Sequence, residues 1–397
     1  MDLVSARLAA LSPSETLAMS QKSNELKARG IDVINLSVGE TDFNTPDHVK
    51  DAAKKAIDEN YSFYSPVPGY LSLREAICNK LKKENNLEYK PDQIVCSNGA
   101  KQSVCNVLLA LVNKGDEVII PAPYWVSYPE MVTIADGKSV IVSAGIEQDF
   151  KITPAQLEAA ITPQTKVFIL CSPSNPTGSV YSRDELKALA DVLAKYPNVY
   201  VLSDEIYEHI NYVGSHESIA QFENIRDRVI VVNGVSKCYA MTGWRIGWIA
   251  APKWIAAACN KLQGQYTSGP CSVAQKAAEA AYIDDAGFVA KVREAFTRRK
   301  KLVMELATQI PDFKVSEPKG AFYIFPDAAA YIGKSYGDRK IENSGDLAMY
   351  LLEVGHVACV GGGAFGAPTC IRISYATSEE NLKKAFARIK DALGKLK

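Results

Sequence analysis

The stretch KVFILCSPSNPTG, residues 166–178, decides the fold. Its first six residues form a short apolar and β-branched run, which is typical of a buried strand. The Ser, Asn, Pro and Gly residues that follow it are typical of a turn. Two later stretches have the same form: VYVLSDEIY at 199–207 and VIVVNGVSK at 229–237. Such strands, separated by longer helical patterns, predict a mostly parallel sheet with crossover helices.

The elements around this stretch predict an α/β fold with two domains. We expect strands at 93–96, 117–120, 166–171, 199–202 and 229–232, and helices at 101–112 and 183–195. Ser182 followed by Glu185 forms a capping box at the start of the second helix. From about Gly287 the pattern changes to a long charged helix over 288–306, short strands, and a closing helix over 379–396. We therefore predict a large α/β domain over 45–286 and a small α+β domain over 287–397, with 1–44 forming an N-terminal arm and part of the small domain.

Composition excludes several classes of protein. The 45 Lys and Arg residues balance the 45 Asp and Glu residues, so the net charge is zero, which argues against an extended nucleic-acid surface. We find no signal-peptide pattern and no apolar run near the roughly 18 residues that a membrane span needs. The nine cysteines form no CxxC pair and the four histidines lack zinc spacing, so we expect no metal site. These features predict a cytoplasmic protein with reduced thiols.

The residues GGGAFG at 361–366 match the GxGxxG pattern of dinucleotide-binding proteins. That fingerprint needs a strand before it, a helix after it and an acidic residue about 20 positions later. Here Ala367 and Pro368 follow, and CIRI at 370–373 predicts another strand. We therefore expect a glycine loop and no nicotinamide cofactor.

Polar residues end three of the predicted strands. Asn175 follows the first, Asp204 the second and Lys237 the third. Because ligands of open α/β sheets bind beyond the carboxyl ends of the strands, we expect these side chains to meet at one edge. An amide, a carboxylate and an ammonium together indicate a ligand with both a basic and an electrophilic atom.

The order of these motifs resembles a known family. NPTG at 175–178, DEIY at 204–207, and SK at 236–237 followed by TGWR at 242–245 resemble the fold type I aminotransferases that use pyridoxal 5′-phosphate, specifically the class I aspartate aminotransferase group. The resemblance runs from LSVGE at 36–40 to RISYA at 372–376. It implies a fold type I architecture in which the large domain binds the cofactor, and a role in amino-acid metabolism and biosynthesis.

The resemblance also implies roles for single residues. Lys237 would form the Schiff base with the cofactor aldehyde and then move a proton, since a lysine amine becomes a good nucleophile once its pKa is lowered. Asp204 would face the pyridine nitrogen and keep it protonated. Asn175 and Tyr207 would hydrogen-bond the cofactor's phenolic oxygen, and Trp125 would stack on the ring.

The cofactor phosphate and the subunit arrangement are implied in the same way. Gly99 and Ala100 precede a helix whose free backbone N–H groups suit a phosphate, and Ser236 and Arg245 resemble its side-chain ligands. Tyr64 matches a tyrosine that reaches the phosphate from the neighbouring subunit. We therefore expect a homodimer with active sites at the subunit interface.

Substrate recognition is expected from residues that resemble two carboxylate-binding groups. Arg372 would hold the substrate α-carboxylate through its planar fork, with Gly39 contributing a backbone contact. Lys101 falls on the position of a lysine that contacts the side-chain carboxylate of aspartate or glutamate. With Trp125 and Asn175 these residues form the predicted substrate site. We predict reversible ping-pong amino transfer between L-aspartate and 2-oxoglutarate.

Several alternatives stay open. Aminotransferases for aromatic, neutral and prephenate or arogenate substrates are the main alternative. Relatives that transaminate prephenate share Pro13, Ser14 and Thr16, but they carry a lysine where this chain has Ser12, and this departure argues against prephenate activity. A synthase or lyase on the same scaffold would share Lys237 and Asp204. A transcription regulator would need a DNA-binding module ahead of Leu36, where we expect a single helix over 15–29.

Overall fold

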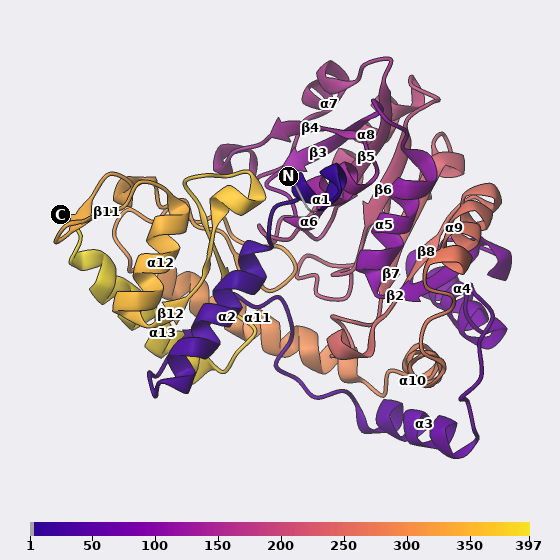
Figure 1. Ribbon diagram of the computed structural model, residues 1–397, viewed down its shortest axis with the longest axis horizontal. Coiled ribbons are helices and arrows are strands. Elements are labelled where there is room, and N and C mark those ends of the chain that lie inside the picture. Colours follow the sequence, from indigo (N-terminus) through magenta and orange to yellow (C-terminus); the bar gives the residue numbers. More distant parts are fainter. Residues whose placement is uncertain (1–3) are drawn as a thin grey trace.

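A seven-stranded sheet forms the centre of the computed structural model, which describes residues 4–397 (Figure 1). Its strands, in spatial order, are β2 (Ile94–Asn98), β8 (Ile246–Ala250), β7 (Val229–Gly234), β6 (Tyr200–Asp204), β5 (Thr165–Cys171), β3 (Glu117–Ala122) and β4 (Lys138–Ser143). Neighbouring strands from β4 to β7 pair in parallel, and β8 runs antiparallel to both β2 and β7. The mostly parallel sheet is thus confirmed.

The central strands are apolar on both faces because helices cover both faces. Phe168 and Leu170 of β5 enter one core, whereas Val167 and Ile169 enter the core on the other side of the sheet. The first core includes residues of α4 (Leu71–Asn85), α8 (Arg183–Ala194) and α10 (Ser272–Ile283). The second includes residues of α5 (Ala100–Leu111), α6 (Ser127–Ile134) and α9 (Lys253–Tyr266). A strand buried in this way reads as a continuous apolar run rather than an alternating one.

Two strands of this sheet were not predicted. β4 lies at the edge, where its residues are exposed or half-buried, so it lacks the continuous apolar run of a central strand. β8 is fully buried but antiparallel, and it follows the 242–245 motif directly rather than a crossover helix. Two helices also border the large sheet: α3 (Asp47–Asp58) packs on α10, and α7 (Pro154–Ala160) packs on α8.

A second group of elements combines the two ends of the chain (Figure 1). Its helices are α11 (Phe288–Ala307), α12 (Ser344–Gly355), α13 (Glu379–Gly394) and the N-terminal α2 (Glu15–Ala28). Its strands are β9 (Tyr323–Ile324), β13 (Val360–Gly361) and β14 (Ile371–Ser374) in one antiparallel sheet, the parallel pair β1 (Ile34–Asn35) and β12 (Val357–Ala358), and the hairpin β10 (Ser335–Tyr336) and β11 (Arg339–Lys340). The three helices predicted here are confirmed to within two residues at each end. The short helix α1 (Ala6–Ala9) precedes α2.

The predicted domain boundaries stay a prediction, because the core of the second group also includes Ile206, Tyr207 and Ile210 from the segment 45–286. Residues of α2, β1, β12, α12 and α13 share one core, which is distinct from the two cores of the large sheet. The first three residues of the predicted 1–44 segment lie outside the described residues. Among residues 4–397 no helix has both the length and the apolar character needed to span a bilayer.

The GGGAFG segment forms a closely packed turn rather than an open glycine loop. After β13, residues Gly362–Phe365 form one turn of 3-10 helix, and the chain then enters β14. A Cβ atom on Gly362 would collide with the backbone of Ala367 and Cys370. The strand predicted at 370–373 is confirmed as β14, and the helix that a dinucleotide site requires is not present at this turn.

Candidate active site

A pocket of about 320 Å³ lies where β5, β6 and β7 end. The structure brings to it most of the residues predicted for the site: Gly39, Ala100, Lys101, Trp125, Asn175, Asp204, Tyr207, Ser236, Lys237, Arg245 and Arg372. Gly99 directly precedes Ala100 and lies against the side chain of Arg245, which lines the pocket. Tyr64 is placed elsewhere.

Lys237 follows β7 and points back toward the N-terminal segment. Its Nζ donates a hydrogen bond to the carbonyl oxygen of Gly39 at 2.6 Å and lies 5.7 Å from the centre of the Tyr207 ring. Removal from water lowers the pKa of Lys237 to about 8, and the positive charge of Arg372 acts in the same direction. About a tenth of this amine is therefore neutral, and nucleophilic, at pH 7, and about half at pH 8.

Asp204 ends β6 as a buried carboxylate. Its Oδ2 accepts a 2.7 Å hydrogen bond from the hydroxyl of Tyr128, and its Oδ1 accepts a 3.3 Å bond from the backbone N–H of Ile206. Burial raises the pKa of Asp204, whereas the Tyr128 hydrogen bond and the charge of Lys237 oppose that rise. Such a carboxylate is suited to pair with a protonated ring nitrogen.

Arg372 is only 2% exposed and connects three segments of the chain. Its Nη1 donates to Oδ1 of Asn175 at 2.9 Å and its Nη2 donates to the carbonyl oxygen of Ser37 at 2.6 Å. The guanidinium also lies 4.7 Å from the centre of the Tyr323 ring. Its buried Nε has no hydrogen-bond partner within the described chain, so this arginine retains donor capacity for a ligand carboxylate.

Arg245 and the start of α5 form an anion-binding corner. Arg245 donates to the backbone carbonyl of Thr242 at 2.8 Å and to that of Asn98 at 3.0 Å. Gly99 has a φ of +83°, and a Cβ atom there would collide with the Arg245 guanidinium. The first backbone N–H groups of a helix lack intrahelical partners, so the start of α5 can donate to a phosphate. Ser236 adds a hydroxyl in the same pocket.

This set of donors fits pyridoxal 5′-phosphate, the cofactor that the sequence resemblance implies. Arg245, Ser236 and the start of α5 would hold the phosphate. Asp204 would pair with the ring nitrogen, and Lys237 is an amine of lowered pKa for the aldehyde. Each chemical group of the cofactor thus has a matching residue in one pocket.

Lys101 and Trp125 lie against each other in this pocket. The ammonium of Lys101 is 5.1 Å from the centre of the Trp125 ring, and this ring meets Tyr128 edge-on at 5.3 Å. Burial lowers the pKa of Lys101, and the charge of Arg245 adds to the effect. A cation at the first turn of a helix opposes the helix dipole, so a ligand carboxylate would relieve this arrangement.

Tyr64 lies outside the pocket of its own chain. It is 98% exposed, and its neighbour Phe63 is 80% exposed. Two neighbouring aromatic side chains that are exposed to water are consistent with a contact with a second subunit. The role of Tyr64 at the partner's phosphate stays a prediction.

Sequence reasoning missed several residues that line the pocket. Tyr128 holds Asp204, and the Tyr323 hydroxyl lies 2.9 Å from that of Tyr207. Leu17, near the start of α2, also lines the pocket, together with Ser14 and Thr16. Tyr128 stands three positions after Trp125, across the turn that leads into α6, and its nearness in sequence to Trp125 was a usable signal. Tyr323 had no comparable signal in the sequence.

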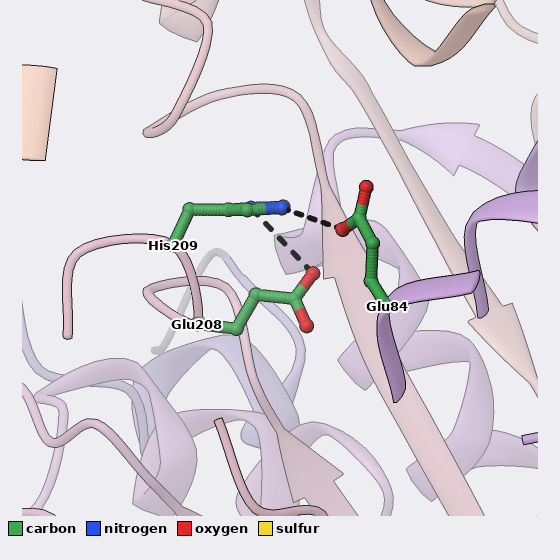
Figure 2. Close-up of side chains that lie close together, drawn as sticks. All are labelled: Glu84, Glu208 and His209. Atoms are coloured by element: carbon green, nitrogen blue, oxygen red, sulfur yellow. Dashed lines mark hydrogen bonds and ion pairs between the residues drawn. The ribbon is translucent and has the colours of Figure 1, made fainter. Parts of the chain in front are cut away.

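A second cluster joins acidic and histidine side chains away from the pocket. Figure 2 shows His209 between Glu84 and Glu208, with its Nε2 2.8 Å from Glu84 and its Nδ1 3.6 Å from Glu208. The ammonium of Lys80 forms a hydrogen bond with Glu208 and lies 3.5 Å from Glu84. Burial opposes the charged form of His209, yet the Glu208 carboxylate raises its pKa to about 10. Two cations therefore balance two carboxylates, as in a structural ion-pair network.

Comparisons with known proteins agree with the geometry of the pocket. Residues 31–389 match the family model described as aminotransferase class I and II. The chain is 50% identical to the aspartate/prephenate aminotransferase of Cereibacter sphaeroides, over 98% of each chain. It is 48% identical to the bifunctional aspartate aminotransferase and glutamate/aspartate-prephenate aminotransferase of Petunia hybrida, over 99% of this chain and 83% of that one.

Solved structures show the same similarity. The aspartate aminotransferase from Rhizobium meliloti superposes with a TM-score of 0.96 at 41% identity, with all of both chains covered. The enzyme from Thermus thermophilus with maleate superposes with a TM-score of 0.93 at 40% identity, over 99% of this chain and 100% of that one. These similarities extend over nearly the whole chain and confirm the expected fold class. The chain belongs to the class I and II aminotransferases, enzymes that depend on pyridoxal 5′-phosphate.

Proposed function

We propose that this enzyme is an aspartate aminotransferase, which moves an amino group reversibly between L-aspartate and 2-oxoglutarate in two half-reactions. The observation that carries the proposal is the presence of two cationic side chains, Arg372 and Lys101, in the same pocket as Lys237. A dicarboxylic amino acid offers one carboxylate to each cation and its amine to the cofactor. The names of the similar proteins from three bacteria and Petunia hybrida include the same donor.

The residues around the cofactor divide the work between them. Bound pyridoxal 5′-phosphate supplies an aldehyde for the amine and a ring that accepts electrons from the substrate α-carbon. The Asp204 carboxylate would hold a proton on the ring nitrogen, while Asn175 and Tyr207 would hydrogen-bond the phenolic oxygen. The Lys237 amine would bond to that aldehyde, and its Nζ would hold and move a proton at the substrate α-carbon.

The substrate is oriented by Arg372 and Lys101. The planar guanidinium of Arg372 forms parallel hydrogen bonds with the α-carboxylate, and its deep burial strengthens this contact because water is excluded. The backbone of Gly39 would add a further contact to this carboxylate, and the Trp125 ring would stack on the cofactor. The Lys101 ammonium, which lies over the face of the Trp125 ring, would pair with the distal carboxylate.

Prephenate is the second candidate substrate. Two relatives carry it in their names, and Ser14 and Thr16, which this chain shares with prephenate-transaminating relatives, line the pocket. Because position 12 is a serine, this chain has no ammonium there. Ser12 is exposed, and its backbone N–H donates to Glu130 at 3.0 Å. We therefore propose prephenate as a weaker amino acceptor than 2-oxoglutarate.

The proposal includes a homodimer that works in the cytoplasm. Tyr64 is nearly fully exposed in the single chain. In a dimer, Tyr64 of each subunit would reach the cofactor phosphate of the other subunit. All nine cysteines are free thiols, which suits a reducing compartment.

A panel of amino donors tests the substrate. The purified enzyme with pyridoxal phosphate and 2-oxoglutarate would be assayed with aspartate, glutamate, alanine, phenylalanine, arogenate and kynurenine. We expect kcat/KM for aspartate to exceed that for alanine by about tenfold or more, the factor expected for one charge-assisted hydrogen bond. A preference for phenylalanine or arogenate over aspartate would replace the proposal with the aromatic or prephenate alternative.

A further inference from the structure

The buried hydroxyl of Tyr128 is the side-chain donor that contacts Asp204. It donates to Oδ2 at 2.7 Å, and both residues are buried, with Tyr128 only 1% exposed. The other carboxylate oxygen, Oδ1, receives only a longer bond of 3.3 Å from the Ile206 backbone. The short, shielded contact is therefore the one that fixes the carboxylate plane.

Tyr128 is itself held firmly. It is the second residue of α6, in the core formed by α5, α6 and α9, and the Trp125 ring meets its ring edge-on at 5.3 Å. Burial raises the pKa of the Tyr128 phenol well above its ordinary value, so the hydroxyl keeps its proton and acts as a donor to the carboxylate. A rigid donor that does not ionise can set both the orientation and the charge of its partner.

We propose that Tyr128 is a positioning residue that holds Asp204 toward the ring nitrogen of the cofactor. This inference rests on the proposed function, in which Asp204 pairs with that nitrogen. Without the Tyr128 hydroxyl, Asp204 would lose its short hydrogen bond and could rotate or take up a proton in its buried position. The contact with the ring nitrogen would weaken, whereas the phosphate and aldehyde contacts would remain.

The test compares two ligands of the cofactor-free protein. One is pyridoxal 5′-phosphate and the other is its analogue with a C–H group in place of the ring nitrogen. Both carry the aldehyde and the phosphate, so they differ only at the atom that Asp204 would meet. Affinities would be measured by absorbance titration for wild type, Tyr128→Phe, Asp204→Ala and Tyr124→Phe, with thermal unfolding to confirm that each variant is folded.

We expect Tyr128→Phe to bind pyridoxal phosphate about tenfold more weakly and to bind the analogue within twofold of wild type. Tyr124→Phe removes a hydroxyl from a half-buried ring of the same segment and should change neither affinity. Equal weakening for both ligands would overturn the inference, because Tyr128 would then only support the shape of the pocket. Unchanged binding of pyridoxal phosphate would also overturn it.

Asp204→Ala separates this inference from the proposed function. If Asp204→Ala abolishes the preference for pyridoxal phosphate and Tyr128→Phe retains it, the proposed role of Asp204 stands and the inference about Tyr128 fails. If Asp204→Ala retains the preference, the ring-nitrogen contact itself fails and the inference fails with it.

Discussion

The ammonium of Lys237 donates a 2.6 Å hydrogen bond to the backbone carbonyl of Gly39, 198 positions earlier in the chain. This bond joins the end of β7 to the segment after β1 and holds the amine inside the pocket. Lys237 must give up this bond when it attacks an aldehyde. The Gly39 carbonyl therefore gives the free amine a defined position in the absence of cofactor.

Replacement of Lys237 by alanine should abolish catalysis. The variant lacks the amine that bonds to the cofactor and moves the proton, so we expect transaminase activity to fall by at least about 10³-fold. The pH-sensitive visible absorbance of bound pyridoxal phosphate should also disappear. Lys83→Ala, on the exposed side of α4, serves as the control and should retain both properties. Turnover near the wild-type rate in Lys237→Ala would refute the assignment.

The rate at which cofactor-free protein captures pyridoxal phosphate should depend on pH. Burial lowers the pKa of Lys237 to about 8, and only the neutral amine attacks an aldehyde. The capture rate should therefore rise with pH, reach half its maximum near pH 8 and then level off. Stopped-flow absorbance would measure it. A midpoint near 10.4, the ordinary value for lysine, would contradict the lowered pKa.

Lys101→Ser should affect dicarboxylic substrates selectively. Removal of the ammonium leaves the distal carboxylate of aspartate without its partner, so we expect the KM for aspartate to rise about 10- to 100-fold. The KM for alanine should change by less than about threefold, because alanine has no distal carboxylate. Steady-state kinetics with both donors would measure this difference, and equal effects on both would exclude a distal-carboxylate role.

Mixed dimers should reveal whether Tyr64 acts across a subunit interface. Tyr64→Ala and Lys237→Ala homodimers should each have low activity. If Tyr64 serves the partner's site, a mixed dimer contains one complete site, which combines Lys237 from one chain with Tyr64 from the other. Activity should therefore recover when the two variants are unfolded and refolded together. No recovery in verified mixed dimers would place the function of Tyr64 within its own chain.

His209 should stabilise the fold more at low pH than at high pH. Its pKa is raised to about 10 in the folded chain, against about 6.5 when unfolded. The stabilisation is thus complete below about pH 6.5 and is lost as the pH rises through 10. His209→Gln should lower Tm more at pH 6 than at pH 10.5, as measured by scanning calorimetry. His48→Gln on α3 is the control, and the same loss of Tm at both pH values would argue against a charged His209.

The sequence predicted those parts of the molecule that depend on local pattern. The apolar run of β5 predicts a strand with helices packed on both faces of its sheet, and Ser182 with Glu185 forms the capping box at the start of α8. Asn175, Asp204 and Lys237 could be placed at one edge because parallel strands end at the same side of a sheet. Local pattern gives no information about which distant side chains touch.

The unpredicted contacts in and around the pocket join distant segments of the chain. Tyr128 reaches Asp204 across 76 positions, and Arg372 reaches Asn175 across 197. The ion-pair network of Glu84, Glu208 and His209 joins α4 to the loop after β6, and neither residue type nor spacing indicates it. For Tyr64 the sequence resemblance predicts a contact that a single chain cannot show, since its expected partner lies on another chain.

The parallel pairing of β1 with β12 has a consequence for the order in which the protein folds as it is synthesised. All seven strands of the large sheet lie between Ile94 and Ala250, so this sheet can assemble while the ribosome is still adding residues. Ile34, by contrast, pairs with Val357, and the backbone carbonyl of Ser37 binds Arg372. The Ile34 segment thus remains unpaired until Val357 has been synthesised. The carboxylate-binding half of the pocket cannot form until Arg372 has been synthesised, so nascent chains would acquire the anion-binding corner first.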